Sequence, residues 1–515
     1  MNNGLSDKQL KQIIDVLRQY KDIDKAVLFG SRAMGNYKKG SDVDIAIMGK
    51  NADFTLAAKI KSHLEDDTYL PYFFDVISYN TIKSDELKEH IRRYGKIILS
   101  GEKKIPKGWV ETTLGEVGLE VLNGYAFKSK NFISSKSGNN ELPVLKIKNV
   151  ANGNTNHNDV VFHKVSFSLE KYIIKKGDTL IALTGNHPFA KTQVVGGVSK
   201  YRLPIKSLLN QRVAKIFSKE KSMLHNEILY YFFKWNNTQF HIGNQSSGSA
   251  SQANISKNDL LNIPINLPPL PEQVAIAKIL TVFDDKIELL QAQNKTLETT
   301  AQTIFKEWFG KYQIGDELPD GWRVGKLSEI ADFLNGLALQ KYPPIAGEET
   351  LPVIKIRELK QGITSNTDKA NTLLNEKYII NNGDVLFSWS GSLEVVIWKY
   401  GRGALNQHLF KVSSENYPKW FYYFWTLHHL KEFKNVAANK ATTMGHINRR
   451  HLDEAIILIP DIMTMNKIGK GLSSVLEKTE NNTTQIQTLK KTRDTLLPKL
   501  MSGALRVDEF KEDTV

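Results

Sequence analysis

Apolar residues recur at alternating steps of four and three along Pro271–Phe309. Nine of the ten positions in this stripe are apolar, so a helix would keep them on one side over four heptads. Pro271 suits the first helical turn, and a helix over Glu272–Phe309 would be about 57 Å long. A rod of this length needs a partner helix. The stripe consists of Ile276, Leu280, Phe283, Ile287, Leu290, Asn294, Leu297, Ala301, Ile304 and Trp308.

A second stripe with the same phase lies 192 residues further along the chain. Three of its positions are polar, which weakens the stripe but keeps its period. Either stripe alone is equally compatible with an ordinary core helix, whereas two in phase indicate a structural repeat with two packed helices. The second stripe consists of Ile468, Leu472, Val475, Thr479, Asn482, Ile486, Leu489, Arg493, Leu496 and Leu500.

The long segments before the two stripes also resemble each other. The offset between matching stretches falls from 213 to 192 residues, so the second copy has shorter loops on a shared frame. Each copy is rich in short strands with Gly, Asn and Asp turns. The matching stretches are 105–127 with 318–339, 142–150 with 351–359, 171–186 with 377–392, 209–216 with 405–412, and 255–268 with 447–460.

These patterns predict an α+β multidomain chain. An N-terminal α/β domain would be followed by two β-rich segments and two long antiparallel coiled-coil helices in a pseudo-two-fold repeat. The predicted parts are the N-terminal domain (1–104), the first β-rich segment (105–270), the first long helix (271–312), the second β-rich segment (313–462), and the second long helix with its tail (463–515).

Composition narrows the classes of protein. The chain has no cysteine, which excludes disulfides and thiolate metal sites. It contains no apolar run that could span a bilayer and no signal-peptide pattern, so we expect a cytoplasmic protein. Of the net charge of +14, residues 1–104 carry +3 and the remainder +11. Such an excess suggests a polyanion partner, although many basic proteins bind none.

The N-terminal region combines a Gly-Ser turn with three carboxylates. Asp42 and Asp44 are two residues apart, so on a strand their side chains point to the same face. Asp75, on a later predicted strand, can join them, and paired carboxylates suit Mg²⁺. The Gly30-Ser31 turn offers N–H groups and a hydroxyl to a phosphate chain. The alternative is a surface turn followed by an ordinary strand with exposed acids.

Together these residues resemble the minimal nucleotidyltransferases of the polymerase-beta-like superfamily. The resemblance implies that Gly30 and Ser31 hold a nucleoside triphosphate, and that Asp42, Asp44 and Asp75 are catalytic and bind two Mg²⁺ ions. Arg32 could reach a phosphate or could be solvated. A hydroxyl acceptor would then attack the α-phosphate and release pyrophosphate. In small relatives the acceptor is often a protein side chain, and several of them act as antitoxins.

Residues 105–505 resemble the specificity subunit of type I restriction-modification enzymes. The resemblance rests on the two Leu-Asn-Gly and Leu-Asn-Gln pairs, the Pro-Leu-Pro-Glu-Gln stretch before the first long helix, and Leu-Leu-Pro-Lys-Leu-Met-Ser-Gly at 496–503. It implies two target-recognition domains that read a bipartite site in double-stranded DNA. It also implies helices that dock two methyltransferase subunits and a restriction translocase, which would supply the S-adenosylmethionine and ATP chemistry. The second helix departs from the pattern, with Pro460-Asp461-Ile462-Met463 before it.

Candidate DNA-binding residues fall into three groups. Basic residues that recur in both copies suit phosphate contact, because shared residues cannot carry different specificities. Polar loop residues that differ between copies suit base reading, and further arginines could contact phosphate or guanine. For each residue the alternative is an ordinary exposed loop position. The groups are Lys146, Lys148, Lys355 and Arg357; Asn186, His187, Lys191, Ser390 and Ser392; and Arg212, Arg402, Arg449 and Arg450.

Three functional hypotheses follow. The first is a DNA-specificity subunit with an added domain that transfers a nucleotide to a protein acceptor. The second is primarily an antitoxin-like nucleotidyltransferase that a DNA-binding module directs to its target. The third is a scaffold with a degenerate metal site. The completeness of the repeat and the presence of all three carboxylates favour the first.

Overall fold

The computed structural model describes residues 3–38, 40–100, 105–150, 153, 155–186, 195–249, 252–313, 315–345, 347–364, 367–439 and 445–507. Two compact units emerge from the contacts, Met1–Ala277 with Leu497–Val515, and Lys278–Leu496. Within the described ranges, no helix is long and apolar enough to cross a membrane.

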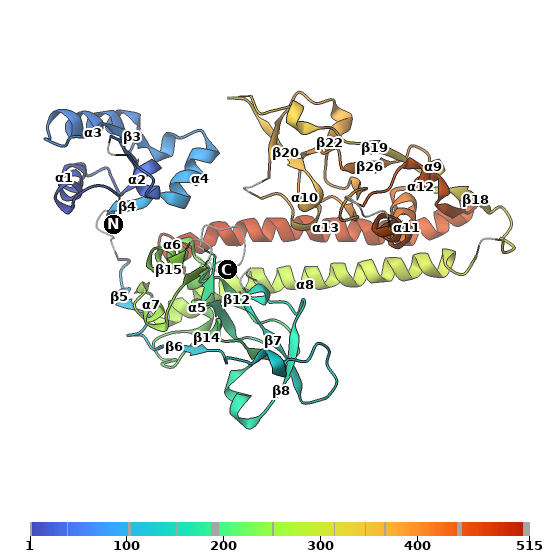
Figure 1. Ribbon diagram of the computed structural model, residues 1–515, viewed down its shortest axis with the longest axis horizontal. Helices are drawn as coiled ribbons and strands as arrows, with labels where there is room; N and C mark the ends of the chain where they lie inside the picture. Colours follow the sequence, from blue (N-terminus) through green and yellow to red (C-terminus); the bar gives the residue numbers. More distant parts are fainter. Residues whose placement is uncertain are drawn as a thin grey trace, which may run out of the picture. The chain divides into compact units, whose positions relative to one another are not determined.

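The N-terminal domain contains a four-stranded sheet in the order β3-β2-β1-β4 (Figure 1). Strands β2 and β3 are parallel, and α3 makes the crossover between them. Helix α1 begins with a capping box between Ser6 and Gln9. The elements are α1 (Asp7–Leu17), β1 (Lys25–Phe29), α2 (Gly30–Met34), β2 (Val43–Met48), α3 (Phe54–Asp66), β3 (Phe74–Ser78), α4 (Asp85–Tyr94) and β4 (Lys96–Ser100).

The first β-rich segment contains two four-stranded sheets, in the orders β12-β10-β14-β6 and β8-β7-β13-β9, and the pair β17-β5. Helix α5 (Asn226–Lys234) is buried along most of its length and packs on β12 and β14. The strands are β5 (Val110–Thr113), β6 (Leu119–Asn123), β7 (Glu141–Leu145), β8 (Val161–Lys164), β9 (Ile173–Ile174), β10 (Thr179–Ala182), β11 (Thr184–Gly185), β12 (Val198–Lys200), β13 (Ser207–Leu209), β14 (Val213–Ser218), β15 (Ser247–Ser249), β16 (Gln252–Asn254) and β17 (Pro264–Leu267).

The second β-rich segment has corresponding strand orders, β24-β23-β26-β19 and β21-β20-β25-β22, with the pair β27-β18. Helix α11 (Lys419–Asn439) covers β24 and β26 and carries a cluster of buried aromatic rings. The strands are β18 (Arg323–Lys326), β19 (Asp332–Asn335), β20 (Thr350–Ile354), β21 (Lys369–Asn371), β22 (Ile379–Ile380), β23 (Val385–Ser388), β24 (Val395–Ile397), β25 (Gly403–Leu405), β26 (Leu409–Ser413) and β27 (Ile456–Ile459).

Shorter helices complete the two segments. Helix α6 contacts α5 and α7 in the first segment, while α9 contacts α11 and α12 in the second. The prediction of a chain that mixes helices and sheets is therefore confirmed. These helices are α6 (Asn236–Gln245), α7 (Lys257–Leu261), α9 (Leu327–Ile330), α10 (Ile356–Gln361) and α12 (Arg449–Glu454).

Two helices of 40 residues each, α8 (Leu270–Phe309) and α13 (Ile462–Met501), coincide with the two stripes. In the second unit, residues further along α8 contact residues that come earlier in α13. The two helices therefore run in opposite directions there. Asp284 forms an ion pair with Arg493, Leu290 packs with Ile486, and Asn482 donates to the Asn294 side chain at 2.9 Å.

In the first unit, Arg506 is joined to the start of α8. Its guanidinium contacts both carboxylate oxygens of Glu272, at 2.7 and 2.9 Å, and donates to the Lys107 carbonyl. Trp109 donates its indole N–H to the same carboxylate at 2.9 Å. Residues separated by 234 positions in the sequence are therefore held together by one partly buried carboxylate.

Candidate functional site

Two of the three predicted carboxylates are neighbours across parallel strands. Asp44 of β2 lies directly opposite Asp75 of β3 in the strand register, so both side chains are on one face of the sheet. Asp42 precedes β2 by one residue and shares the alternation of Asp44. Asp44 is partly buried, whereas Asp42 and Asp75 are exposed. The fold thus brings together the three carboxylates that the sequence predicted.

The electrostatics of Asp44 reflect this arrangement. Burial raises the pKa of Asp44 to about 6, with further contributions from the nearby Asp75 and Asp42 carboxylates, while Arg32 opposes the shift. A divalent cation would relieve this repulsion, so the set fits Mg²⁺ in charge and ligand type. Among the described residues, however, no group of three or more His, Asp or Glu side chains already has the spacing of a metal site.

Gly30 lets the backbone pass beside the Asp44 carboxylate. Its φ is +70°, a left-handed conformation that glycine adopts easily. A Cβ atom at this position would lie 2.1 Å from Asp44 Oδ2. Helix α2 starts at Gly30, so the partly exposed Ser31 follows directly next to the carboxylates. The Gly-Ser turn and the carboxylates therefore occupy one site, as the sequence spacing suggested.

The structure corrects the prediction for Arg32. Its side chain is only 1% exposed and donates to the carbonyls of Ser41, Asp42 and Asn3. The guanidinium also lies 4.5 Å from the Tyr72 ring centroid. With its donors directed at backbone carbonyls, Arg32 holds the turn that carries Asp42 and is not placed to bind a phosphate.

The recurring basic residues predicted as phosphate contacts take part in local interactions. The Lys146 ammonium lies 4.9 Å from the Phe132 ring centroid, and Lys148 pairs with Asp159 at 3.4 Å. In the second segment the pairs are Lys355–Asp368 and Arg357–Glu358. The Lys148–Asp159 and Lys355–Asp368 pairs are exposed and exchange partners at low cost, whereas the partner of Arg357, Glu358, is fully buried. Phosphate contact by these residues stays a prediction.

The predicted arginines differ in their surroundings. Arg402 pairs with Glu376 at 3.4 Å, and Arg450 with Glu454 at 2.6 Å. Arg212 and Arg449 are exposed, and no ion pair to either is present among the described residues. These two arginines therefore present the less compensated guanidinium groups.

The residues predicted to read bases differ in their exposure to solvent. Ser390 is 4% exposed and its hydroxyl is hydrogen-bonded to His408 Nδ1 at 3.0 Å, which corrects its assignment as a direct base reader. Ser392 is exposed and accepts a hydrogen bond from Lys360 at 2.7 Å. Asn186 follows β11 and accepts a backbone hydrogen bond from Val195. His187 and Lys191 lie outside the described residues.

Sequence reasoning missed His408 and Trp389, which lie beside Ser390. The Trp389 ring centroid is 5.7 Å from that of His408, and the indole N–H donates to Asn335 Oδ1 at 2.9 Å. The available signal was the shared Leu-Asn-Gln stretch, which is followed by Arg212 in one copy and by His408 in the other.

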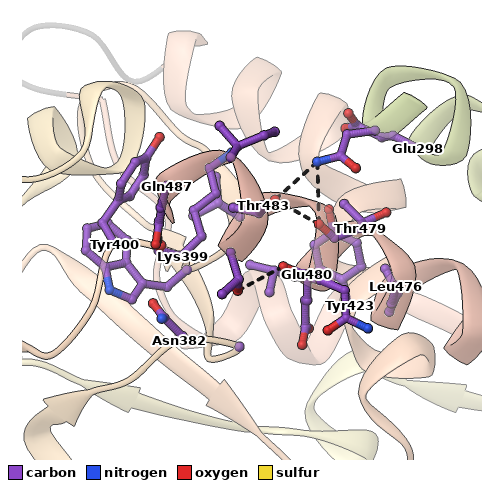
Figure 2. A pocket seen from close by; sticks show the side chains of 18 of the residues that line it. Glu298, Asn382, Lys399, Tyr400, Tyr423, Leu476, Thr479, Glu480, Thr483 and Gln487 are labelled. Carbon is purple, nitrogen blue, oxygen red and sulfur yellow. Dashed lines mark hydrogen bonds between the residues drawn. The ribbon is translucent and has the colours of Figure 1, made fainter. Parts of the chain in front are cut away.

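A cavity of about 620 Å³ lies in the second unit between the helices α8 and α13 and the β23–β24 region (Figure 2). Its walls carry both signs of charge, including Lys399 and Lys490 against Glu298 and Glu480. Tyr400 and Gln487 line one side. None of the predicted nucleotide- or DNA-binding residues contributes to its walls.

Known protein families match two separate parts of this chain. The family model for the type I restriction modification DNA specificity domain matches residues 106–299 and 319–491. The family model described as polymerase beta, nucleotidyltransferase, matches residues 11–104. The specificity subunit of the type I restriction enzyme MjaIX of Methanocaldococcus jannaschii is 27% identical over 429 residues, which cover 79% of this chain and 96% of the relative.

Two solved structures were also compared. The type I restriction-modification S subunit of M. genitalium is 15% identical, with a TM-score of 0.49 over 76% of this chain and 96% of that chain. A toxin-antitoxin structure with AMP-PNP is 23% identical, with a TM-score of 0.17 over 18% of this chain and 74% of that chain.

Proposed function

Because this chain belongs to the type I restriction-modification DNA specificity family and carries an N-terminal nucleotidyltransferase domain, we propose that its two β-rich segments read the two parts of a bipartite DNA target. The observation that carries the proposal is the matching order of the strands in the two segments. A duplicated frame with different loops suits two recognition surfaces that bind different sequences.

The helices α8 and α13 form the spacer in this proposal. Their opposite directions and paired apolar residues support an antiparallel coiled coil within a pseudo-two-fold repeat. A helix of this length spans about 60 Å, which corresponds to about 18 base pairs of DNA. The target would therefore consist of two short sequences separated by base pairs that the protein does not read.

The same helices would dock two methyltransferase subunits and a restriction subunit, which bring S-adenosylmethionine and ATP to the complex. Exposed apolar side chains on α8 support this role. Val282 is 60% and Leu289 is 52% exposed, and they are separated by one heptad. Large apolar side chains in such a row are typical of a surface that a partner covers.

The N-terminal domain would transfer a nucleotide to a side-chain hydroxyl of a protein acceptor. Gly30 and Ser31 would hold the triphosphate, and Asp42, Asp44 and Asp75 would bind Mg²⁺, which supplies positive charge for the transferring phosphate. In the reaction the acceptor oxygen forms a bond to the α-phosphorus and pyrophosphate leaves. Support comes from the convergence of the three carboxylates beside the Gly-Ser turn.

The specificity role is tested by co-expressing the chain with its methyltransferase and mapping methylated bases across the host genome. We expect a two-part motif with a fixed gap. A single contiguous motif, or no new methylation from a soluble complex, would contradict the proposal. The second outcome, together with nucleotide incorporation, would favour a nucleotidyltransferase that a DNA-binding module directs to its target.

The transferase role is tested separately with radiolabelled nucleoside triphosphates and Mg²⁺. The double variant Asp42→Asn and Asp44→Asn should lose incorporation into protein while the methylated motif stays the same. Asp66→Asn, which removes an exposed carboxylate on α3 that accepts a hydrogen bond from Ser62, is the matched control. Equal incorporation by the double variant and the control would reject the assignment.

A further inference from the structure

The two β-rich segments share a backbone frame at the ends of their central strands. In the first, the Leu183 N–H donates to the Arg212 carbonyl at 3.0 Å. In the second, the Trp389 N–H donates to the His408 carbonyl at 3.3 Å. These bonds follow directly from the β10–β14 and β23–β26 ladders, in which Ala182 pairs with Val213 and Ser388 with Leu409. Arg212 and His408 are therefore structurally equivalent.

A second pair of equivalent positions lies beside the first. The Ile255 N–H donates to the Leu183 carbonyl, and the Ile447 N–H to the Trp389 carbonyl, both at 2.9 Å. The residues that precede these isoleucines are Asn254 and His446. In the ladder Asn254 pairs with Thr184, and His446 forms a bridge with Ser390.

The turns that carry the first pair are also capped alike. Asn210 Oδ1 accepts from the Arg212 N–H at 3.5 Å, and Asn406 Oδ1 accepts from the His408 N–H at 3.3 Å. The asparagine and the glutamine that follows it are shared by both copies, whereas the next residue is not. A common turn therefore presents arginine in one segment and histidine in the other.

The side chains on this frame have different hydrogen-bonding chemistry. Arg212 is exposed, and no described residue forms an ion pair with it, so its guanidinium can present two parallel donors. His408 is held in place, because Nδ1 is bonded to the Ser390 hydroxyl and the ring packs against Trp389. Fixed rotamers of this kind are suited to reading a base edge.

A shared frame with different side chains is what discrimination between two DNA sequences requires. Residues that are the same in both copies can position the backbone of DNA but cannot distinguish the two half-sites. Arg212 and His408, with Asn254 and His446 beside them, combine identical backbone geometry with different donors and acceptors. This combination separates them from Lys146 and its counterpart Lys355, because the same basic residue stands in both copies.

We propose that the position occupied by Arg212 in the first segment and by His408 in the second is the principal base-reading position of each segment, with Asn254 and His446 beside it. The proposal rests on the DNA-specificity function proposed above. Arg212 would read a guanine through its O6 and N7 acceptors, since this is the pairing that its two donors favour. His408, whose Nε2 lies 3.3 Å from the Gln407 side-chain amide nitrogen, would read a base edge in the other half-site together with that amide.

The test uses the full chain in complex with its methyltransferase, and the readout is the methylated motif. Arg212→Ala should relax one base position in one half-site only, with a loss of discrimination of about 10–100-fold at that position. His408→Gln should alter the other half-site only. The exchanges Arg212→His and His408→Arg should each change the preferred base in the half-site concerned. Arg323→Ala, an exposed arginine paired with Glu329 and given no role in DNA binding, is the matched control and should leave the motif unchanged.

The outcomes separate the inference from the function on which it rests. If the unmodified complex methylates no bipartite motif, the proposed function fails. If it does so, and the variants methylate the unchanged motif at normal levels, only the inference fails. If a folded variant complex loses methylation, its binding to duplexes with single base changes is measured by competition. Lost discrimination in one half-site supports base reading, and an equal loss for all duplexes overturns it.

Discussion

Removing one partner of the buried ion pair between Asp284 and Arg493 should strongly destabilise the helix pair. Asp284 is 6% exposed and Arg493 is 11% exposed, and their side chains are in direct contact. Removing one partner of a buried pair costs about 3–5 kcal/mol, because the remaining charge stays in the interior. After Asp284→Ala, Arg493 keeps Asp494 at 2.8 Å as a partner, so we expect about 3 kcal/mol, near the lower limit.

This loss corresponds to a fall in Tm of about 6–12 °C for a unit of this size. Thermal unfolding of the full chain can be followed by tryptophan fluorescence, because six of the eight tryptophans lie in the second unit. Asp494→Asn is the matched control. Asp494 is 57% exposed, and its loss should cost under about 1 kcal/mol. Replacing both Asp284 and Arg493 with leucine and methionine should recover most of the stability.

Equal effects of Asp284→Ala and Asp494→Asn would refute the reasoning, because they would mean that burial of the pair adds nothing to its energy. Failure of the double replacement to recover stability would instead show that the pair has a net stabilising role. The single variants test whether burial makes the pair costly to break, and the double replacement tests whether the pair has a net stabilising role, so both experiments are needed.

Three further predictions concern the site and the helix pair. Because burial raises the pKa of Asp44 to about 6, the folded protein binds the extra proton between about pH 4 and 6, and stability falls as pH rises through this window. Asp44→Asn should therefore raise Tm by a few °C, about 1 kcal/mol after solvent screening, at pH 7.5 but not at pH 4 in scanning calorimetry. Gly30→Ala should destabilise the N-terminal domain by about 1–3 kcal/mol and reduce the rise in Tm that Mg²⁺ gives, as measured by thermal shift. Gly40→Ala is the control and should change neither quantity, because a Cβ atom at Gly40 would have no other atom within 4 Å. Replacing both Asn294 and Asn482 with leucine should raise the urea midpoint of unfolding, but the two helices should hold their register less firmly. The looser register should appear as faster limited proteolysis. Unchanged proteolysis would show that the two amides do not fix the register.

The long helices and the strand content could be predicted from sequence, because both depend on a local period. The phase of the apolar stripes placed Asn294 in the first stripe and Asn482 in the second, and the structure pairs these two side chains. The carboxylate site could also be predicted from sequence, since side chains two residues apart in extended chain lie on one face. Asp42, directly before β2, and Asp44, within it, have this spacing.

Other features depend on contacts that no local pattern contains. Arg32 follows the Gly-Ser turn and had the chemistry of a phosphate ligand, yet Tyr72, 40 positions away, covers its guanidinium. Ser390 lies in a polar stretch, but His408, from the turn between β25 and β26, is hydrogen-bonded to its hydroxyl. Contacts between residues far apart in the sequence decide which of these side chains reach solvent.

The link from Arg506 to Glu272 has a consequence for the timing of synthesis. The carboxylate and its guanidinium partner are 234 residues apart, a stretch that a ribosome translates in about 10–50 s. During that interval the first β-rich segment has already been synthesised. Glu272 can accept the hydrogen bond from the Trp109 indole, but the Arg506 guanidinium that also binds this carboxylate has not yet been made. The Arg506–Glu272 contact of the first unit is thus among the last contacts that can form during synthesis. A chain that stops before Arg506 leaves Glu272 without this partner, and we expect proteases to cleave its first unit more readily.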